Sequence, residues 1–196
     1  MKKITLIIPL IVLLTSFTSV KLFFKNKNIV YIQTLGKFND EYIKHIQKQL
    51  ESFYDVKTVI KPKIELTDDI LSSSRTKYDA DKILDKFNSN ENLLLLVEGD
   101  ISYNNGINSE MSIFGLGLCP GNTCVISTFK LKDNAPDNKV IERLLKVSIH
   151  EIGHNLGLDH CENDDKCMMS ANNGTIKTID KNKIWFCKNC MKKIKK

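Results

Sequence analysis

One twelve-residue stretch of the chain, HEIGHNLGLDHC, contains three of its four histidines. His150 and His154 are four residues apart, so on a helix both imidazoles would project from one face and could bind one metal ion. Glu151 would lie about 100° further round that helix, where it could reach a metal-bound water without being a ligand. Gly157 tolerates a positive φ, so it can end the helix and turn the chain back to bring His160 to the metal. The stretch therefore predicts a helix that ends in a three-histidine metal site.

Three neutral imidazoles leave the fourth position of a tetrahedral zinc ion open for water, which is typical of a catalytic rather than a structural site. In this interpretation, zinc acidifies the water and polarises a peptide carbonyl, while Glu151 takes the proton as general base and passes it to the leaving amine. The alternative is an amphipathic helix that merely carries polar residues. Five fixed positions would match by chance in a chain of this length with a probability of ~10⁻⁴, so the metal site is favoured.

A second cluster of potential ligands follows the histidines: Cys161, Cys167 and the CxxC pair Cys187 and Cys190. Four thiolates would form a closed tetrahedral zinc site that holds the C-terminal region beside the third histidine. Two disulfides are the alternative, because an exported protein meets oxidising conditions. The terminal CxxC favours zinc.

Two further cysteines, Cys119 and Cys124, flank a Pro120-Gly121 pair that predicts a type II turn in a β-hairpin. They could form a disulfide if the domain is exported, or remain buried thiols if it is not. No cysteine precedes Cys119, so no upstream thiolate is present to block a catalytic metal.

Two lysines precede an uncharged, apolar run from residue 4 to residue 20. This pattern predicts a signal peptide or an uncleaved membrane anchor in residues 1–20, followed by a basic linker (21–28) and one catalytic domain (29–196). We therefore expect export or membrane anchoring rather than a cytoplasmic location. The net charge of +6 comes partly from lysines at both ends of the chain, which indicates solvated tails rather than a nucleic-acid-binding surface.

Apolar periodicity predicts an α/β fold, a twisted mixed sheet with packed helices. The expected strands are 29–34, 56–60, 93–97, 111–117 and 123–129, and the expected helices are 40–54, 79–87, one from residue 137 or 138 through His154, and a short basic one at the C-terminus. Asp100 and Tyr103 are expected in a loop, and His45 at the surface of the first helix.

The order HExxHxxGxxHC, C-x-M and CxxC resembles the archaemetzincin family, and the likeness extends over residues 29–190 through the segments TKYDA (76–80), 97–100, FGLG (114–117) and 127–128. Cys161 and Cys167 are separated by five residues where the family is expected to have four, which puts the conformation of that loop in doubt but not the ligands. The resemblance implies a metzincin-like zincin domain with two zinc ions per chain, one catalytic and one structural. It also implies that Met169, rather than its neighbour Met168, forms a tight turn under the histidines.

The resemblance further implies a peptide substrate that pairs with an edge strand, supplied by residues 113–117 or by residues 124–128. We therefore predict a monomeric zinc-dependent metallopeptidase acting on peptides or proteins, with aminopeptidase-type activity as one option. The alternative is a two-zinc scaffold or interaction module with little turnover, which the presence of Glu151 disfavours. A third alternative is a nucleic-acid-binding zinc ribbon that uses the C-terminal lysines, which would require strongly salt-dependent binding. A CxxC thiol oxidoreductase is weaker still, because a metal site already accounts for the four cysteines.

Overall fold

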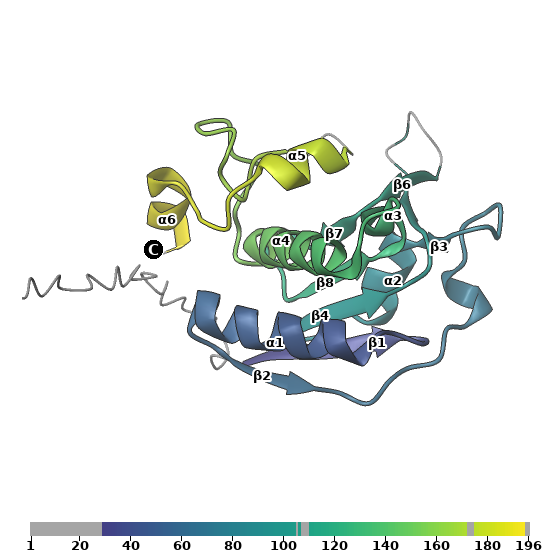
Figure 1. Ribbon diagram of the computed structural model, residues 1–196. Coiled ribbons are helices and arrows are strands. Elements are labelled where there is room, and N and C mark those ends of the chain that lie inside the picture. The colour runs from purple at the N-terminus through teal and green to yellow at the C-terminus, as the bar shows by residue number, and fades with distance from the viewer. Residues whose placement is uncertain (1–28, 105, 107–109, 172–174, 195–196) are drawn as a thin grey trace, which may run out of the picture.

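The computed structural model describes residues 29–104, 106, 110–171 and 175–194 (Figure 1). The predicted signal peptide or anchor and the predicted linker lie outside these residues. Within the described ranges, no helix is long and apolar enough to cross a membrane.

The main sheet has five strands: β1 (Ile29–Leu35), β2 (Lys57–Ile60), β4 (Asn92–Val97), β7 (Gly115–Gly117) and β8 (Thr123–Ser127). Their order is β2-β1-β4-β8-β7, with parallel pairing except between β7 and β8. All of β4 is buried, as predicted for a central strand covered on both faces. Among the described strands β7 has a neighbour on one side only, so the edge strand is the 113–117 segment rather than 124–128.

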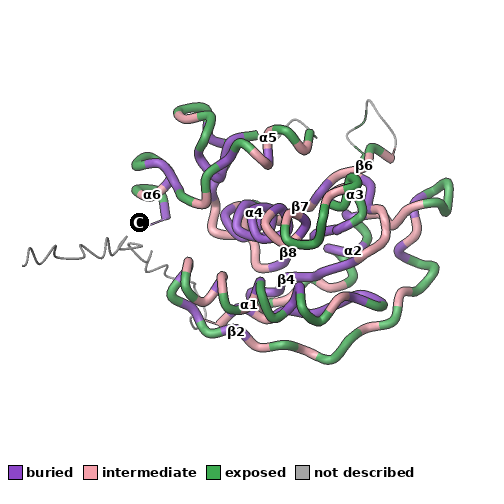
Figure 2. Tube along the Cα trace, in the orientation of Figure 1, coloured by how far each residue is buried: buried purple, intermediate pink, exposed green. Residues whose placement is uncertain are grey.

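Helices cover both faces of this sheet because alternate side chains of each strand point to opposite sides. Leu94 and Leu96 of β4 pack into the core shared with α1 (Asp40–Tyr54) and α4 (Asp137–Asn155). Leu93 and Leu95 pack instead with α2 (Ala80–Lys86). Figure 1 shows α1 and α4 together on one side of the sheet and α2 on the other, and Figure 2 shows burial concentrated in the strands and in α4. The mixed α/β fold is therefore as predicted.

Specific hydrogen bonds define the start of α1 and its contact with α4. Asn39 caps α1, because its side-chain oxygen accepts a hydrogen bond from the Glu41 amide at 2.9 Å. At the other end of α1, the buried hydroxyl of Tyr54 donates to the Ile149 carbonyl of α4 at 2.7 Å. His45 is exposed on α1, as expected. The Tyr54 hydrogen bond therefore joins the end of α1 to α4.

A second sheet was not predicted. It comprises β3 (Tyr78–Asp79), β5 (Ile101–Tyr103) and β6 (Met111–Ile113), in the order β3-β5-β6. The prediction that Tyr103 lies in a loop is wrong, whereas Asp100 does precede the strand. The predicted 111–117 strand is broken at Phe114, whose side chain is buried in the main core, so β6 and β7 belong to different sheets. Strands of two or three residues are too short to produce a recognisable period in the sequence.

The hairpin between β7 and β8 also differs from the prediction in its turn. The peptide bond before Pro120 is cis, and Gly121 lacks the positive φ that a type II turn requires. The strand ends at Ser127 rather than Phe129, because the Ser127 hydroxyl accepts from the Phe129 amide at 3.0 Å and the chain enters α3 (Phe129–Lys132).

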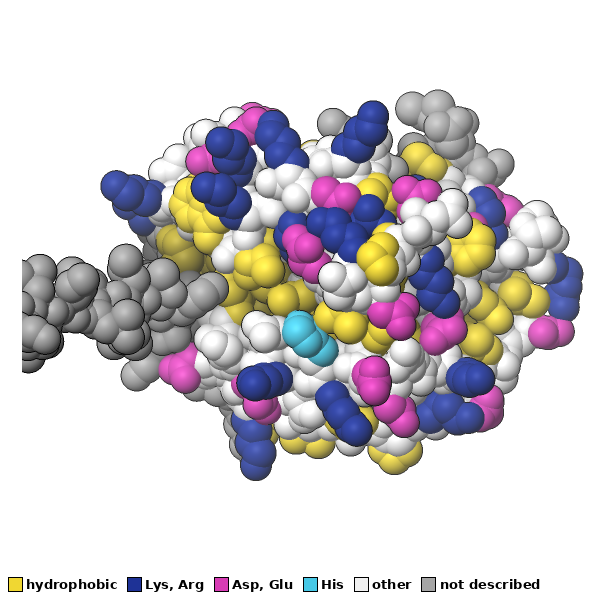
Figure 3. Space-filling view, viewed as in Figure 1, with side chains coloured by type: hydrophobic (Ala, Val, Ile, Leu, Met, Phe, Trp, Pro, Cys, Tyr) yellow, Lys and Arg dark blue, Asp and Glu magenta, His cyan; other side chains and the backbone are white. Residues whose placement is uncertain are grey.

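The C-terminal region packs onto α4. A short helix not predicted from the sequence, α5 (Ile176–Lys181), is joined to α4 by Arg143, whose guanidinium donates to both carboxylate oxygens of Asp180 at 2.9 and 2.8 Å. The basic helix α6 (Lys188–Ile194) follows, as predicted. On the face shown in Figure 3, basic and acidic side chains are interspersed rather than gathered by sign.

Candidate metal centres

The HEIGHNLGLDH segment folds as its spacing predicts. His150 and His154 lie one turn apart on α4, which ends at Asn155. Gly157 has φ +84°, and its amide donates to the His154 carbonyl at 2.8 Å. The chain therefore turns back after the helix and brings His160 to the other two histidines, so that one ring nitrogen of each lies within 4.8 Å of the others.

Backbone carbonyls fix the tautomers of the two helical histidines. His150 Nδ1 donates to the Met168 carbonyl and His154 Nδ1 donates to the Leu158 carbonyl, both at 2.7 Å. Burial lowers the pKa of His150 to about 3 and also lowers the pKa of His154, so both rings are neutral. Each Nε2 therefore carries a lone pair, and the two Nε2 atoms face each other at 3.2 Å. Nitrogens bound to one tetrahedral zinc ion lie about 3.3 Å apart, so the pair fits a shared metal.

Glu151 is buried between α4 and the edge strand β7. A Cβ atom at Gly115 would lie 2.8 Å from Glu151 Cγ, and one at Gly117 would lie 2.7 Å from the Glu151 carbonyl oxygen. Only glycines therefore allow β7 to approach the helix this closely. Burial raises the pKa of Glu151 to about 8, although a hydrogen bond from the Gly117 amide opposes this rise.

A cleft of about 490 Å³ opens above these residues. Glu151 and the three histidines lie on its floor, and the edge strand β7 forms one wall. Its remaining lining residues are apolar or glycine: Met111, Ile113, Phe114, Gly115, Leu116, Gly117, Cys119 and Ala171. An extended peptide could therefore lie along β7 directly above the histidines.

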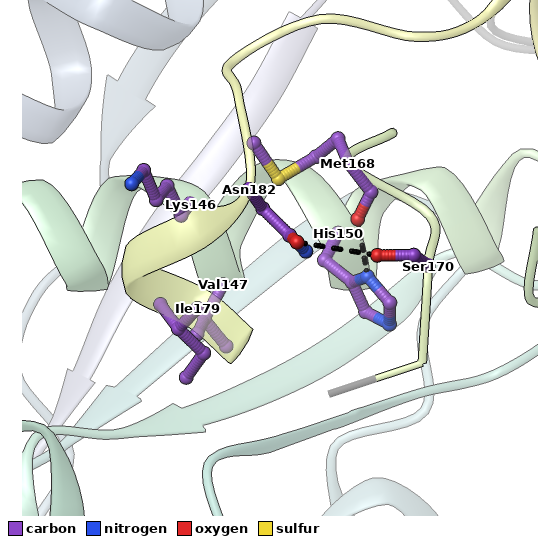
Figure 4. Close-up of a pocket in the computed structure, with 7 residues that line it drawn as sticks. All are labelled: Lys146, Val147, His150, Met168, Ser170, Ile179 and Asn182. Carbon is purple, nitrogen blue, oxygen red and sulfur yellow. Dashed lines mark hydrogen bonds between the residues drawn. The ribbon is translucent and has the colours of Figure 1, made fainter. Parts of the chain in front are cut away.

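The two methionines beneath the histidines have separate contacts. Met169 is fully buried, and its thioether lies against Gly153 of α4 so closely that a Cβ there would collide with the sulfur. The Met168 carbonyl accepts from His150, and Figure 4 shows this contact beside the hydrogen bond between Ser170 and Asn182. Met169 therefore packs against the helix that carries His150 and His154, while the Met168 carbonyl orients His150.

The second cluster brings together Cys161, Cys167, Cys187 and Cys190, all buried, with their sulfurs within 4.8 Å of one another. Cys161 Sγ lies 3.6 Å from Cys187 Sγ, and Cys167 Sγ lies 3.8 Å from Cys190 Sγ. A disulfide would hold two sulfurs about 2.05 Å apart. Thiolates about 2.3 Å from one tetrahedral zinc ion lie about 3.8 Å apart, so the cluster fits a zinc ion rather than two disulfides.

All six cysteines lie in the described part of the chain, and all are free. The optional disulfide between Cys119 and Cys124 is therefore absent. Cys119 is exposed at the cleft, with its thiol 3.5 Å from the Leu158 carbonyl, whereas Cys124 is fully buried in the main core.

Asn155 shapes the site but was not recognised from the sequence. Asn155 is the residue after His154, and its side-chain amide is assigned the orientation that satisfies its neighbours. In that orientation it donates to the carbonyls of Leu118 and Thr123 at 3.1 Å each and accepts from the Thr123 amide at 3.2 Å. Its own carbonyl accepts from the Gly121 amide at 3.0 Å. Asn155 thereby joins the metal-site helix to the hairpin that contains the edge strand. A polar residue at the end of a helix gives no sign of such distant partners in the sequence.

Comparisons with known proteins agree with this site. The model of peptidase family M54 matches residues 18–196. An archaemetzincin from Methanocaldococcus jannaschii is 33% identical over 171 residues, which cover 84% of this chain and 92% of that protein. The crystal structure of an archaemetzincin from Archaeoglobus fulgidus, complexed with malonate, superposes with a TM-score of 0.75 at 28% identity, covering 85% of this chain and 99% of that one.

The structure of an archaemetzincin from Methanopyrus kandleri, 24% identical, shares the fold with a TM-score of 0.71 over 87% of this chain and 96% of that chain. The resemblance drawn from the HExxHxxGxxHC and CxxC patterns is confirmed, because the family model spans most of the chain. The chain thus belongs to the archaemetzincins of peptidase family M54 and is a zinc metallopeptidase with peptides or proteins as substrates.

Proposed function

We propose that His150, His154 and His160 hold the catalytic zinc ion and that Glu151 is the general base of peptide hydrolysis. The observation that carries this proposal is the pair of facing Nε2 lone pairs, 3.2 Å apart, with a buried carboxylate on the next residue. Two neutral acceptors placed this close repel each other unless a cation lies between them. When bound, zinc polarises the peptide carbonyl and makes a water molecule acidic.

Different residues of the chain would then transfer the proton, position the substrate and orient the histidines. Glu151 lies under the edge strand, where it takes a proton from the attacking water and returns it to the leaving amine. The Gly117 amide holds the carboxylate in place. The substrate backbone would pair with the free edge of β7, which brings its carbonyl over the histidines. The carbonyls of Met168 and Leu158 keep the imidazoles in the tautomer that leaves Nε2 free.

We also propose that Cys161, Cys167, Cys187 and Cys190 bind a second, structural zinc ion, giving two per chain. Four thiolate ligands leave no position for a substrate. Sulfur separations of 3.6 and 3.8 Å support this proposal. The Cys161 amide also donates to the Met169 carbonyl at 2.7 Å, so this centre is joined to the turn beneath the histidines.

The direct test of the catalytic proposal is Glu151→Gln. The amide cannot accept the proton, so we expect zinc content to stay at the parent level and kcat for peptide cleavage to fall by about 10³-fold. The matched control is Glu65→Gln, which removes a carboxylate from an exposed side chain away from the cleft. Equal cleavage by Glu151→Gln and the parent would contradict the general-base role.

The same assay separates the remaining options for the activity. Short peptides with free amino termini should be compared with acetylated copies of the same sequence. Cleavage of only the free peptides would show an aminopeptidase, and cleavage of both an endopeptidase. Stable zinc binding without cleavage of either set would favour the two-zinc scaffold.

We further propose that residues 1–20 direct export or anchor the chain in a membrane, on the basis of two lysines followed by an uncharged apolar run. Fractionation of the producing cells, followed by N-terminal sequencing of the product, tests this. Export should give a chain that begins after the apolar run, and anchoring an intact chain in the membrane fraction. An intact chain in the soluble cytoplasmic fraction would contradict the proposal.

A further inference from the structure

On the side of the second sheet, the wall of the cleft above the histidines is formed by apolar side chains of β6. Met111 and Ile113 of β6 line it, and Met111 is 40% exposed. Large apolar side chains left open to water beside a binding cleft mark a contact surface. Among the described strands, the other large apolar residue that is exposed is Ile60, which lies on β2, an edge strand of the main sheet, and does not line the cleft.

Two charged residues near this wall, Asp100 and Lys130, are hydrogen-bonded to Ser112 of β6. Side chains alternate along a strand, so Ser112 points away from the face that Met111 and Ile113 share. The Ser112 hydroxyl donates to Asp100 at 2.7 Å, and the Ser112 carbonyl accepts from Lys130 at 2.9 Å. Neither Asp100 nor Lys130 is among the described residues that line the cleft. The wall therefore presents carbon and sulfur atoms to a ligand.

We propose that β6 is a specificity wall, with Met111 and Ile113 selecting peptides that carry a large uncharged apolar side chain at one position beside the cleaved bond. This inference rests on the proposed function, because it names the substrate class of the same cleft. An apolar side chain there buries its surface against the methionine and isoleucine. A lysine or glutamate side chain placed against Met111 and Ile113 loses water without gaining a charged partner from either of these two residues.

The experiment uses peptides that differ only in one residue, scanned through each position on both sides of the cleaved bond. Alanine, leucine, lysine and glutamate are compared by kcat/KM. At one position we expect the parent to prefer leucine over lysine and glutamate by about tenfold or more. Equal rates for the charged and apolar peptides at every position would overturn the inference while leaving the peptidase function intact.

Two variants assign the preference to the wall. Met111→Glu should reduce the leucine preference and raise cleavage of the lysine peptide, because it supplies the missing opposite charge. Ile60→Glu is the matched control: it makes the same type of change on an exposed strand residue outside the cleft and should leave the ratios unchanged. A Met111→Glu profile identical to that of the parent would overturn the assignment.

Binding to the zinc-loaded Glu151→Gln protein provides a readout that does not depend on turnover. The leucine peptide should bind about tenfold more tightly than the lysine peptide, and adding Met111→Glu should remove that difference. If the binding difference is found but the parent cleaves no peptide, the specificity role of Met111 and Ile113 would stand and the proposed catalysis would be refuted. Equal binding of both peptides would overturn the wall regardless of activity.

Discussion

At the scale of single residues, the metal site depends on positions where a side chain is missing. Gly153 lies on the α4 turn between the two helical histidines, and the Met169 thioether occupies the space that a Cβ would need. Met169 is fully buried. Glycine in a helix normally costs about 1 kcal/mol relative to alanine. In this protein the close contact between Gly153 of α4 and Met169 offsets that cost.

Gly153→Ala should therefore destabilise the protein by about 1–3 kcal/mol despite the better helix propensity of alanine, because overpacking forces Met169 out of its place. Thermal unfolding with zinc analysis measures this. The double variant Gly153→Ala/Met169→Ala should recover part of the loss, since the two changes meet at one contact. A single variant with an unchanged or higher melting temperature would contradict the proposed packing.

At the scale of elements, hydrogen bonds of Asn155 join the hairpin that contains the edge strand to α4. Asn155 makes four hydrogen bonds to the β7–β8 hairpin, three from its side chain and one from its carbonyl. The histidines are on the same helix, so these bonds determine how far the strand lies above the metal site. Asn155 is a positioning residue that contacts neither the proposed metal nor the substrate.

Asn155→Ala should raise KM for peptides several-fold while the zinc content stays at the parent level, because the hairpin loses its connection to the helix. The loss of hydrogen bonds to buried groups should also cost about 1–3 kcal/mol of stability. Asn138→Ala, an exposed change in the first turn of the same helix, is the control. A variant that loses stability with KM unchanged would show that Asn155 is merely structural.

The sequence predicted the elements whose signal is long or locally repeated. The buried run of β4 and the nineteen-residue helix α4 were recognised by apolar pattern, and the metal clusters by ligand spacing. The β3-β5-β6 sheet was missed, because its strands have two or three residues and are stabilised by contacts far apart in the chain, such as Ser112 with Asp100. The roles of Gly115 and Gly117 could not be derived either, since they depend on how closely β7 approaches Glu151.

At the scale of the whole molecule, the described residues form two clusters of potential metal ligands that share one loop. His160 belongs to the first cluster and Cys161 to the second, so adjacent residues join the proposed catalytic site to the C-terminal region. That region also packs on α1 through Phe186, whose ring lies 5.5 Å from that of Phe53. Loss of the proposed second zinc ion should therefore loosen His160, the proposed third catalytic ligand, as well as the C-terminal region.

The most direct test of this account is zinc content per chain, measured together with free thiols, for the parent and for His154→Ala. Two zinc ions in the parent falling to one in the variant, with all six cysteines reduced after denaturation, is the predicted result. It would show that the histidine and cysteine clusters bind metal independently. One zinc ion in the parent that His154→Ala leaves in place, or no zinc ion at all, would contradict the account.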